Sequence, residues 1–304
     1  MGFFMSLFLS LGLGSLFLSI DDLSSSTRAM YLDNGVVKIG VDPKYGGMIS
    51  YFSSSSTEPN KNLINHHDLT RGVQISLSAG PSDYCISKSG KKMYWNPLAG
   101  GCEKIPSTII EMEKTGENTL TLITLPKLNG CKNEVCECYI KTTITLEKGK
   151  NYAIISSSLV NHRSASEESV TLTQKVPSAY LIGELNQFET YTGDWPYNDY
   201  ALETITLSQG HWQSVPSKEH WIASVNSQSG KGVGLINLQY DQVLLGFNGK
   251  GKGTEKDYQA AFMDFQESML IADNYTYNFQ YYLVYGTAHD IRKVAYELKG
   301  YVLN

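Results

Sequence analysis

Short runs of alternating apolar and polar residues recur along most of the chain. The first lies at residues 36–41, and Gly46 and Gly47 then turn the chain into a second run at 48–52. Further runs of this kind lie at residues 73–77, 107–112, 119–124, 139–146, 152–160, 170–172, 221–225, 232–238, 242–247 and 277–285. Alternate side chains of a strand point to opposite faces, so this period of two indicates strands. Because no helical period separates them, the runs predict an all-β sandwich.

The end of the chain combines a strand with a helix. The strand expected at 277–285 carries aromatic and apolar side chains on one face, at Phe279, Tyr281, Leu283 and Tyr285. Behind it, apolar residues recur at helical spacing, at Ile291, Val294, Ala295 and Leu298. Thr287 or Asp290 can cap this helix. We therefore predict a short C-terminal amphipathic helix that packs against the flank of the sandwich.

The beginning of the chain has a different composition. Residues 3–20 contain no charged side chain, no Lys or Arg precedes them, and Asp21 and Asp22 end the run. Its length lies between the core of a signal peptide and the roughly 20 residues of a membrane span. We expect residues 1–20 to be a cleaved signal peptide of a secreted protein, or alternatively an uncleaved membrane anchor. Residues 28–304 are expected to form one domain, since no repeat or linker divides them.

The charge and the cysteine content of the chain indicate which partners, disulfides and cofactors to expect. The net charge is −5 and the lysines are scattered, so nucleic acid is not expected as a partner. An exported chain meets oxidising conditions, and its five cysteines therefore predict disulfides. We expect Cys85 to pair with Cys102, a local pair within residues 131–138, and one thiol left over. No CxxC pair or nearby histidine completes a metal site, and no metal or other cofactor is expected.

The richest polar cluster lies at residues 62–71, just before a predicted strand. It contains Asn65, His66, His67, Asp68 and Arg71. Polar side chains on a loop beside a rigid sheet are typical of binding sites. Neighbouring histidines in an extended segment face opposite ways, so at most one points into a given cleft. A structural alternative is that Asn65 and Asp68 form Asx turns and that Arg71 pairs with Asp68.

Aromatic loops and late carboxylates provide further candidates. Their residues are Trp95, Asn96, Tyr191, Trp195, Glu219, His220 and Glu267. Aromatic rings bind the C–H faces of sugars, while amides and carboxylates bind sugar hydroxyls. The alternative for each aromatic residue is that it folds back onto the core.

The order of these motifs resembles the galactose-mutarotase-like superfamily over nearly all of the chain after the N-terminal segment. The motifs are GVVKIGVD at 35–42 with Gly46-Gly47, NLINHHDLTR at 62–71, WNP at 95–97, YTG at 191–193, EHW at 219–221, GVG at 232–234, and YYLVYGT at 281–287 followed by Ile291-Arg292. The resemblance implies a large antiparallel β-supersandwich with a sugar cleft. In aldose 1-epimerases of this superfamily a histidine protonates the ring oxygen and a late glutamate removes the anomeric proton. An arginine, a second histidine and an aspartate hold the sugar.

Carried over, the resemblance implies Glu267 as the base, Arg71 as a sugar-holding residue, and His67, His220 or His66 as the acid. The spacing from Arg71 to these histidines departs from the mutarotase pattern, and Lys175 stands where an acidic residue is expected. The sequence therefore predicts a secreted, carbohydrate-active protein that binds a mono- or oligosaccharide, acting as an epimerase, lyase or hydrolase. The alternative is a lectin-like module that binds glycans without turnover.

Overall fold

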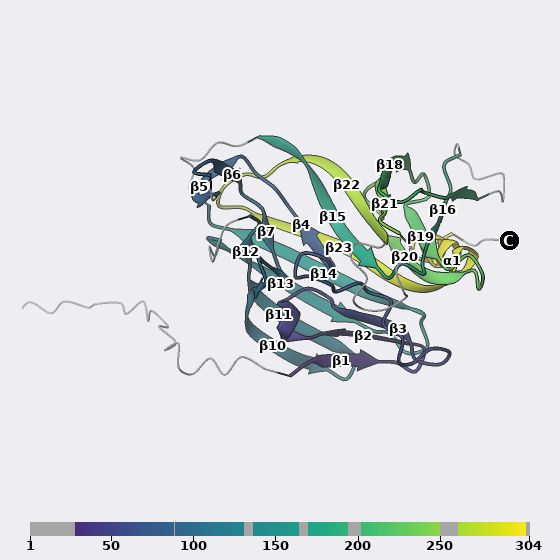
Figure 1. Ribbon diagram of the computed structural model, residues 1–304. Helices are drawn as coiled ribbons and strands as arrows, with labels where there is room; N and C mark the ends of the chain where they lie inside the picture. Colours follow the sequence, from purple (N-terminus) through teal and green to yellow (C-terminus); the bar gives the residue numbers. More distant parts are fainter. Residues whose placement is uncertain are drawn as a thin grey trace, which may run out of the picture.

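The computed structural model describes residues 28–87, 89–130, 136–163, 170–193, 202–249 and 261–301. Two large antiparallel sheets dominate it, with smaller sheets at their edges and a helix at the C-terminal end (Figure 1). The prediction of an all-β fold with a short C-terminal helix is confirmed. Residues 1–20 lie outside the described part, in which no helix is long and apolar enough to cross a membrane.

The larger sheet has nine strands. In spatial order they are β10 (Thr108–Gly116), β11 (Thr119–Leu125), β13 (Cys138–Thr145), β14 (Tyr152–Asn161), β23 (Thr276–Thr287), β20 (Lys231–Ile236), β19 (Trp221–Val225), β16 (Gln187–Thr190) and β17 (Glu203–Ile205). Strand β23 therefore lies at the centre of the sheet, paired with β14 and β20.

The second sheet has seven strands. Their spatial order is β12 (Lys127–Leu128), β7 (Pro97–Leu98), β4 (Val73–Ser76), β15 (Thr171–Leu181), β22 (Ala261–Leu270), β21 (Gln242–Phe247) and β18 (His211–Pro216). The sequence pattern predicts a strand at only 170–172 in place of β15 and none in place of β22. These two strands pair along most of their length and form the middle of this sheet.

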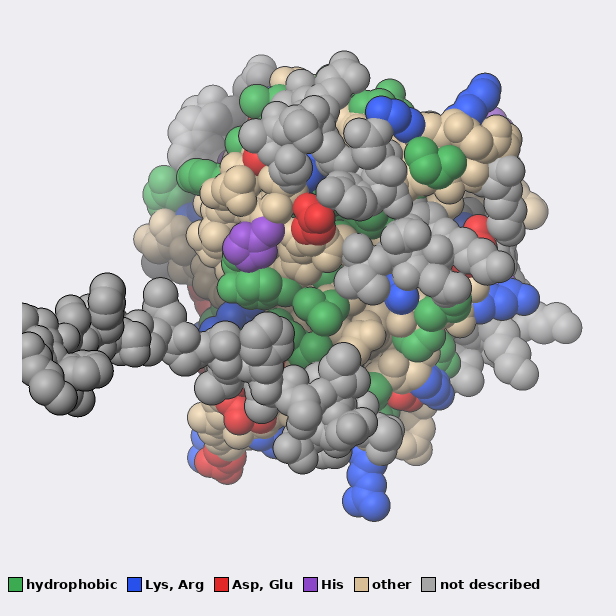
Figure 2. Space-filling model, turned by 90° about the vertical axis from the view of Figure 1, so that its left-hand side faces the viewer, with side chains coloured by type: hydrophobic (Ala, Val, Ile, Leu, Met, Phe, Trp, Pro, Cys, Tyr) green, Lys and Arg blue, Asp and Glu red, His purple; other side chains and the backbone are tan. Residues whose placement is uncertain are grey.

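Short elements complete the described part. They are β1 (Met30–Asp33), β2 (Val37–Val41) and β3 (Tyr51–Ser54), which form one sheet, the hairpins β5 (Pro81–Ile86) with β6 (Lys92–Tyr94) and β8 (Gly101–Cys102) with β9 (Ile105–Pro106), and the 3-10 turn η2 (Pro43–Tyr45). Acidic, basic and apolar side chains are interspersed on the face of the molecule that Figure 2 shows.

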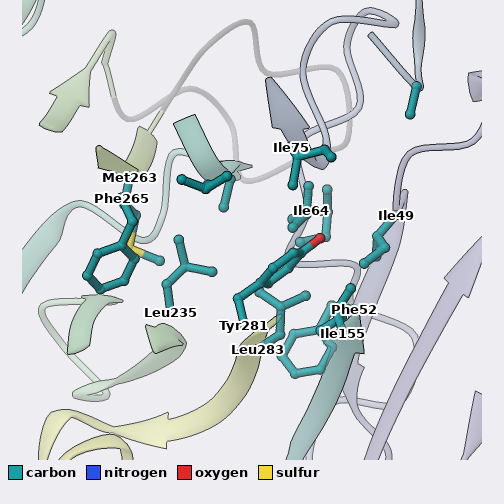
Figure 3. Packing of buried hydrophobic residues seen from close by; sticks show 14 of the residues in the cluster. Ile49, Phe52, Ile64, Ile75, Ile155, Leu235, Met263, Phe265, Tyr281 and Leu283 are labelled. Carbon is teal, nitrogen blue, oxygen red and sulfur yellow. The ribbon is translucent and has the colours of Figure 1, made fainter. Parts of the chain in front are cut away.

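The main core lies between the two large sheets. Figure 3 shows Met263 and Phe265 of β22 on one side of it. Leu235 of β20 and Leu283 of β23 lie on the other side, and all four side chains are fully buried. Burial of a side chain of this size stabilises the fold by about 1.5–3 kcal/mol. The alternation in β22 leaves the side chain of Asp264, between the two core residues, on the outer face of the sheet.

A smaller apolar cluster joins the C-terminal helix α1 (Ala288–Leu298) to the other face of the nine-stranded sheet. Tyr282 and Val284 of β23 pack against Ile291 and Val294 of this helix. A Cβ at Gly234 would lie 2.5 Å from the Ile291 side chain, so a glycine is needed for this close approach. Thr287 is the N-cap and forms a capping box with Asp290, as the sequence predicts.

The expected pairing of Cys85 with Cys102 is wrong. Cys102 is a free, buried thiol, and its sulfur accepts a hydrogen bond from the backbone N–H of Gly130 at 3.1 Å. Cys136 and Cys138 lie together, with Cα atoms 5.2 Å apart, and their oxidation stays a prediction. Cys131 lies outside the described residues. Sequence spacing does not show which thiols share a face, and this is why the longer pairing failed.

Candidate functional site

A polar cavity of about 360 Å³ opens on the outer face of the seven-stranded sheet. We call it the cleft. Its lining residues are Thr70, Arg71, Gln74, Ser76, Ser78, Asn96, Leu98, Asn129, Thr173, Lys175, Ser178 and Tyr180. Most of these side chains can donate or accept hydrogen bonds, and the volume is within the range of small-molecule sites. Among the described residues that line the cleft there is no histidine.

A buried ion pair lies at one wall of the cleft, where Lys175 lines the cavity and its partner Asp264 is not among the lining residues. Asp264 is fully buried, the ammonium of Lys175 lies 2.8 Å from its Oδ2, and the hydroxyl of Ser178 donates to its Oδ1. Burial raises the pKa of the Asp264 carboxyl, and Lys175 and Ser178 oppose this rise. Burial alone would lower the pKa of Lys175, but the Asp264 carboxylate raises it above its ordinary value. The pair therefore places a strengthened base next to a proton donor.

A bulge in β15 produces this arrangement. Lys175 is opposite Gln266 and Ser178 is opposite Asp264, so four residues of β15 span three of β22. In a regular strand, Lys175 and Ser178 would point to opposite faces. The extra residue puts both side chains on the outer face, where both reach the same carboxylate. Pro177 lies within the bulge, where a strand tolerates a residue without an N–H.

Arg71 and Tyr180 form the adjoining wall. The guanidinium of Arg71 pairs with Asp68 and lies 6.0 Å from the centre of the Tyr180 ring. Burial, followed by the Asp264 charge, raises the pKa of the Tyr180 hydroxyl. The cleft thus presents two cations, each balanced by its own carboxylate, around an aromatic ring.

Amide side chains hold the walls in place. Gln174, on the inner face of β15, accepts from the backbone N–H of Ser78 at 2.6 Å and donates to the carbonyl oxygens of Ser78 and Met269, both at 2.9 Å. Asn96 donates to the carbonyl oxygen of Leu77 at 2.7 Å. These bonds tie the segment around residue 78 to β15 and β22. The cleft is therefore built on a rigid sheet.

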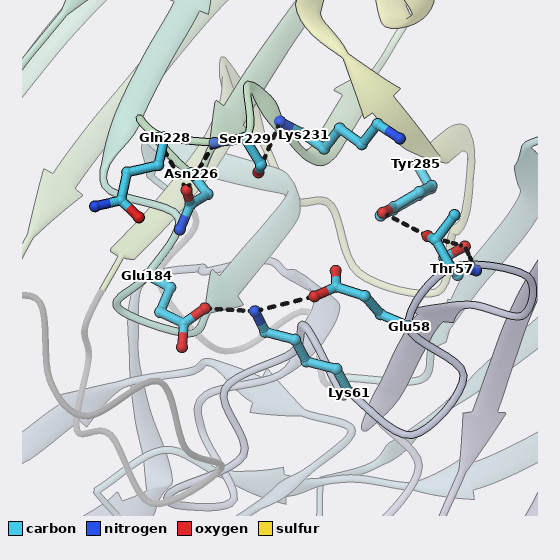
Figure 4. Close-up of polar contacts among 10 residues, drawn as sticks. Thr57, Glu58, Lys61, Glu184, Asn226, Gln228, Ser229, Lys231 and Tyr285 are labelled. Atoms are coloured by element: carbon cyan, nitrogen blue, oxygen red, sulfur yellow. Dashed lines mark hydrogen bonds and ion pairs between the residues drawn. The ribbon is translucent and has the colours of Figure 1, made fainter.

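The loop that leads to the predicted cluster is fixed at several points. Lys61 bridges Glu58, at 3.4 Å, and Glu184, as Figure 4 shows. Thr57 shares a 3.1 Å hydrogen bond with the hydroxyl of Tyr285. Contacts with residues far along the chain therefore fix in space the loop that precedes residues 62–71.

Some residues of the predicted cluster at 62–71 belong to the cleft, and others have a structural role. Arg71 lines the cleft. Asp68 does not line it but forms an ion pair with Arg71. Asn65 is buried and accepts from the backbone N–H of His67 at 2.9 Å, and Asp68 accepts in the same way from Thr70. These are the Asx turns of the structural alternative.

The two adjacent histidines lie in opposite environments. His66 is buried, with its Nδ1 2.9 Å from the amide nitrogen of Asn62 and its ring against Tyr45. His67 is exposed. Neither lines the cleft.

Glu219 stabilises the helix rather than the cleft. Its fully buried carboxylate accepts from Nε of Arg292 at 2.8 Å, from the hydroxyl of Tyr296 at 2.8 Å and from Nε1 of Trp221 at 2.7 Å. The guanidinium of Arg292 lies 5.1 Å from the ring centre of Tyr191, which is also buried. These contacts occupy the carboxylate within the protein, so the structure does not bring Glu219 and Tyr191 to the cleft.

The remaining candidates are dispersed. Glu267 is opposite Gln174, on the face of β22 away from Lys175 and Asp264. His220 has a left-handed backbone, with φ 64°, and its Nδ1 lies 3.1 Å from the carbonyl oxygen of Tyr240. Trp95 is buried in the core, whereas Asn96 lines the cleft. Trp195 lies outside the described residues.

Asp264 and Tyr180 are not among the site residues predicted from the sequence. Asp264 lies between Met263 and Phe265, and an acidic residue between two apolar ones is the signal that could have placed it on the outer face of a strand. Tyr180 is two residues after Ser178, so in a strand both side chains lie on the same face. Both signals depended on recognising β15 and β22 as strands.

Solved structures share this architecture at low sequence identity. A galactose mutarotase related enzyme from Lactobacillus acidophilus is similar over 86% of this chain and 98% of its own, with a TM-score of 0.53 and 11% identity. A galactose mutarotase-like protein from Lactobacillus casei is similar over 85% of this chain and 100% of its own, with a TM-score of 0.51 and 11% identity. The chain has the galactose-mutarotase-like fold.

The galactose-mutarotase-like fold also occurs within longer enzymes. An α-galactosidase from Lactobacillus brevis is similar over 88% of this chain but only 40% of its own, with a TM-score of 0.51 and 11% identity. No protein-family model and no curated protein matches the sequence. At these identities the likeness concerns the fold, and the residues of the cleft carry the functional argument.

Proposed function

We propose that this chain is a carbohydrate-active protein that binds a sugar in the cleft and interconverts its anomers. The observation that carries the proposal is the buried Asp264 carboxylate, with its raised pKa, beside the Lys175 ammonium at the wall of a polar cavity. An acid and a base close to one carbon atom are what sugar ring opening requires. The names of two similar structures, a galactose mutarotase related enzyme and a galactose mutarotase-like protein, support the same reaction.

The proposed reaction balances within the pair. Asp264 takes the proton of the anomeric hydroxyl while Lys175 gives a proton to the ring oxygen, and the bond between that oxygen and the anomeric carbon breaks. Rotation of the open-chain aldehyde exposes its other face to the ring hydroxyl. On closure Lys175 takes back the proton of the ring hydroxyl and Asp264 gives its proton to the carbonyl oxygen, so both residues return to their starting states and no co-reactant is needed. Arg71 and Tyr180 position the sugar through its hydroxyls and its C–H face.

Export is part of the proposal. The uncharged run at residues 3–20 supports secretion through a cleaved signal peptide, or anchoring outside the cell if the run is retained. Free sugars or glycans outside the cell would then be the substrates.

A lectin-like function is the second candidate, and one observation favours it. The Lys175 ammonium already pairs with the Asp264 carboxylate without any sugar, and it opposes the rise in pKa by which burial strengthens this base. A cleft with this pair would still bind sugar hydroxyls.

Anomer interconversion of α-D-galactose and α-D-glucose, followed by NMR, tests the first candidate. The protein should accelerate the reaction, and Asp264→Asn should lower the rate by about 10²- to 10⁴-fold. Glu113→Gln, an exposed carboxylate of β10, is the control and should leave the rate unchanged. Binding on a glycan array without acceleration would favour the lectin-like candidate. Absence of both binding and acceleration would overturn the proposal.

A further inference from the structure

A second cavity, of about 510 Å³, opens beside the cleft. Ser78, Asn96, Asn129 and Thr173 line both cavities. The backbone N–H of Asn129 donates to the carbonyl oxygen of Asn96 at 2.8 Å, which fixes the boundary between them. The two cavities therefore form one continuous trough on the same side of the sheet.

The second cavity differs from the cleft in character. Met93, Tyr94 and Leu172 line it but do not line the cleft. The Tyr94 side chain is 55% exposed, whereas the next residue, Trp95, is 2% exposed. Alternation along the chain turns Trp95 into the core and leaves Tyr94 facing solvent. An exposed ring beside shared amide groups suits the C–H face of a sugar and its hydroxyls.

The charged residues of the two cavities indicate which kind of glycan fits. Arg71 and Lys175 in the cleft are each paired with a carboxylate, of Asp68 and Asp264 respectively. None of the described residues that line the second cavity is charged. An anionic glycan would find no unbalanced cation among these residues, so the trough fits a neutral one.

We propose that the second cavity is a subsite for further units of a neutral oligosaccharide whose terminal unit lies in the cleft, with Tyr94 as the stacking platform. The inference rests on the proposed function, because it assumes that the cleft holds a sugar. It adds that the ligand is a chain of several units and that affinity grows with the number of units.

An array of galacto-, gluco- and manno-oligosaccharides of one to four units, followed by calorimetry on the sugars that bind, tests the subsite. Affinity should rise by about tenfold from the monosaccharide to the longer forms. Tyr94→Ala should remove most of this gain and leave monosaccharide affinity unchanged. Tyr301→Ala, which removes a similarly exposed ring beyond α1, is the matched control and should change neither affinity.

The outcomes separate the two proposals. Equal affinity for one and for several units, or an equal loss for both with Tyr94→Ala, would overturn the subsite and leave the cleft as a monosaccharide site. Binding of no sugar on the array would overturn the proposed function and the subsite together.

Discussion

The ammonium of Lys175 lies 2.8 Å from the carboxylate of Asp264 on the neighbouring strand. Asp264 is fully buried, and the Lys175 side chain is 29% exposed. A charged carboxylate in such a place requires a partner, because burial without one costs several kcal/mol. The pair is thus a part of the fold, and its ammonium also lines the cleft.

Removing the ammonium should destabilise the protein. Lys175→Met leaves the Asp264 carboxylate without its cation, and we expect the free energy of unfolding at pH 7 to fall by about 3 kcal/mol in urea titrations. Lys218→Met is the matched control, because Lys218 pairs with Asp241 at 3.0 Å on the surface, with both side chains about 40% exposed. That variant should lose less than about 1 kcal/mol. Similar losses in the two variants would contradict a buried pair.

The pH dependence of stability and of anomer interconversion should reflect the titration of the Asp264 carboxyl. Burial raises its pKa in the folded protein above the ordinary value of 3.8, so the folded state holds this proton at a pH where the unfolded state has lost it. Its contribution to stability therefore falls as pH rises from about 3.8 through the raised pKa. Anomer interconversion should be lost on acidification at a midpoint above 3.8, since the base must be ionised. A pH–rate profile measures this midpoint, and a midpoint at or below 3.8 would count against Asp264 as the base.

Glu219 should prove important for stability. Glu219→Gln leaves the Arg292 guanidinium, which is 3% exposed, without its carboxylate. Burial lowers the pKa of Arg292 and Glu219 raises it. Without Glu219 the guanidinium still stays charged, because arginine is not deprotonated in proteins. We expect the free energy of unfolding to fall by about 3–5 kcal/mol, measured by urea denaturation. Glu113→Gln, at an exposed position, should change it by less than about 0.5 kcal/mol. If Glu219→Gln lowers the free energy of unfolding by less than about 0.5 kcal/mol, the buried network does not stabilise the packing of the helix.

Parts of the fold follow from local pattern. Alternation at residues 277–285 predicts the central strand β23, and helical spacing after Thr287 predicts α1 with its cap. These elements are readable because their apolar side chains recur at a regular period. Arg71 is likewise a residue of the polar cluster that lines the cleft, and its position next to a strand made it a candidate.

The strands that carry the cleft were hidden for a physical reason. β15 contains Lys175 and Pro177, and β22 contains Asp264 and Glu267, residues that are depleted in ordinary strands. The same polar side chains that make a site interrupt the apolar pattern that reveals a strand. Glu267 was therefore chosen as the late carboxylate, although it lies on the other face of β22 from Lys175.

By itself the sequence determined the all-β class, the closing strand and helix, and a polar segment ending at Arg71, because each depends on residues close together along the chain. Only the tertiary structure decided which carboxylate meets Lys175. That choice depends on the register between β15 and β22 and on a bulge that reverses the facing of part of β15. A shift of one residue moves a side chain to the opposite face, and no local pattern in either strand fixes that register.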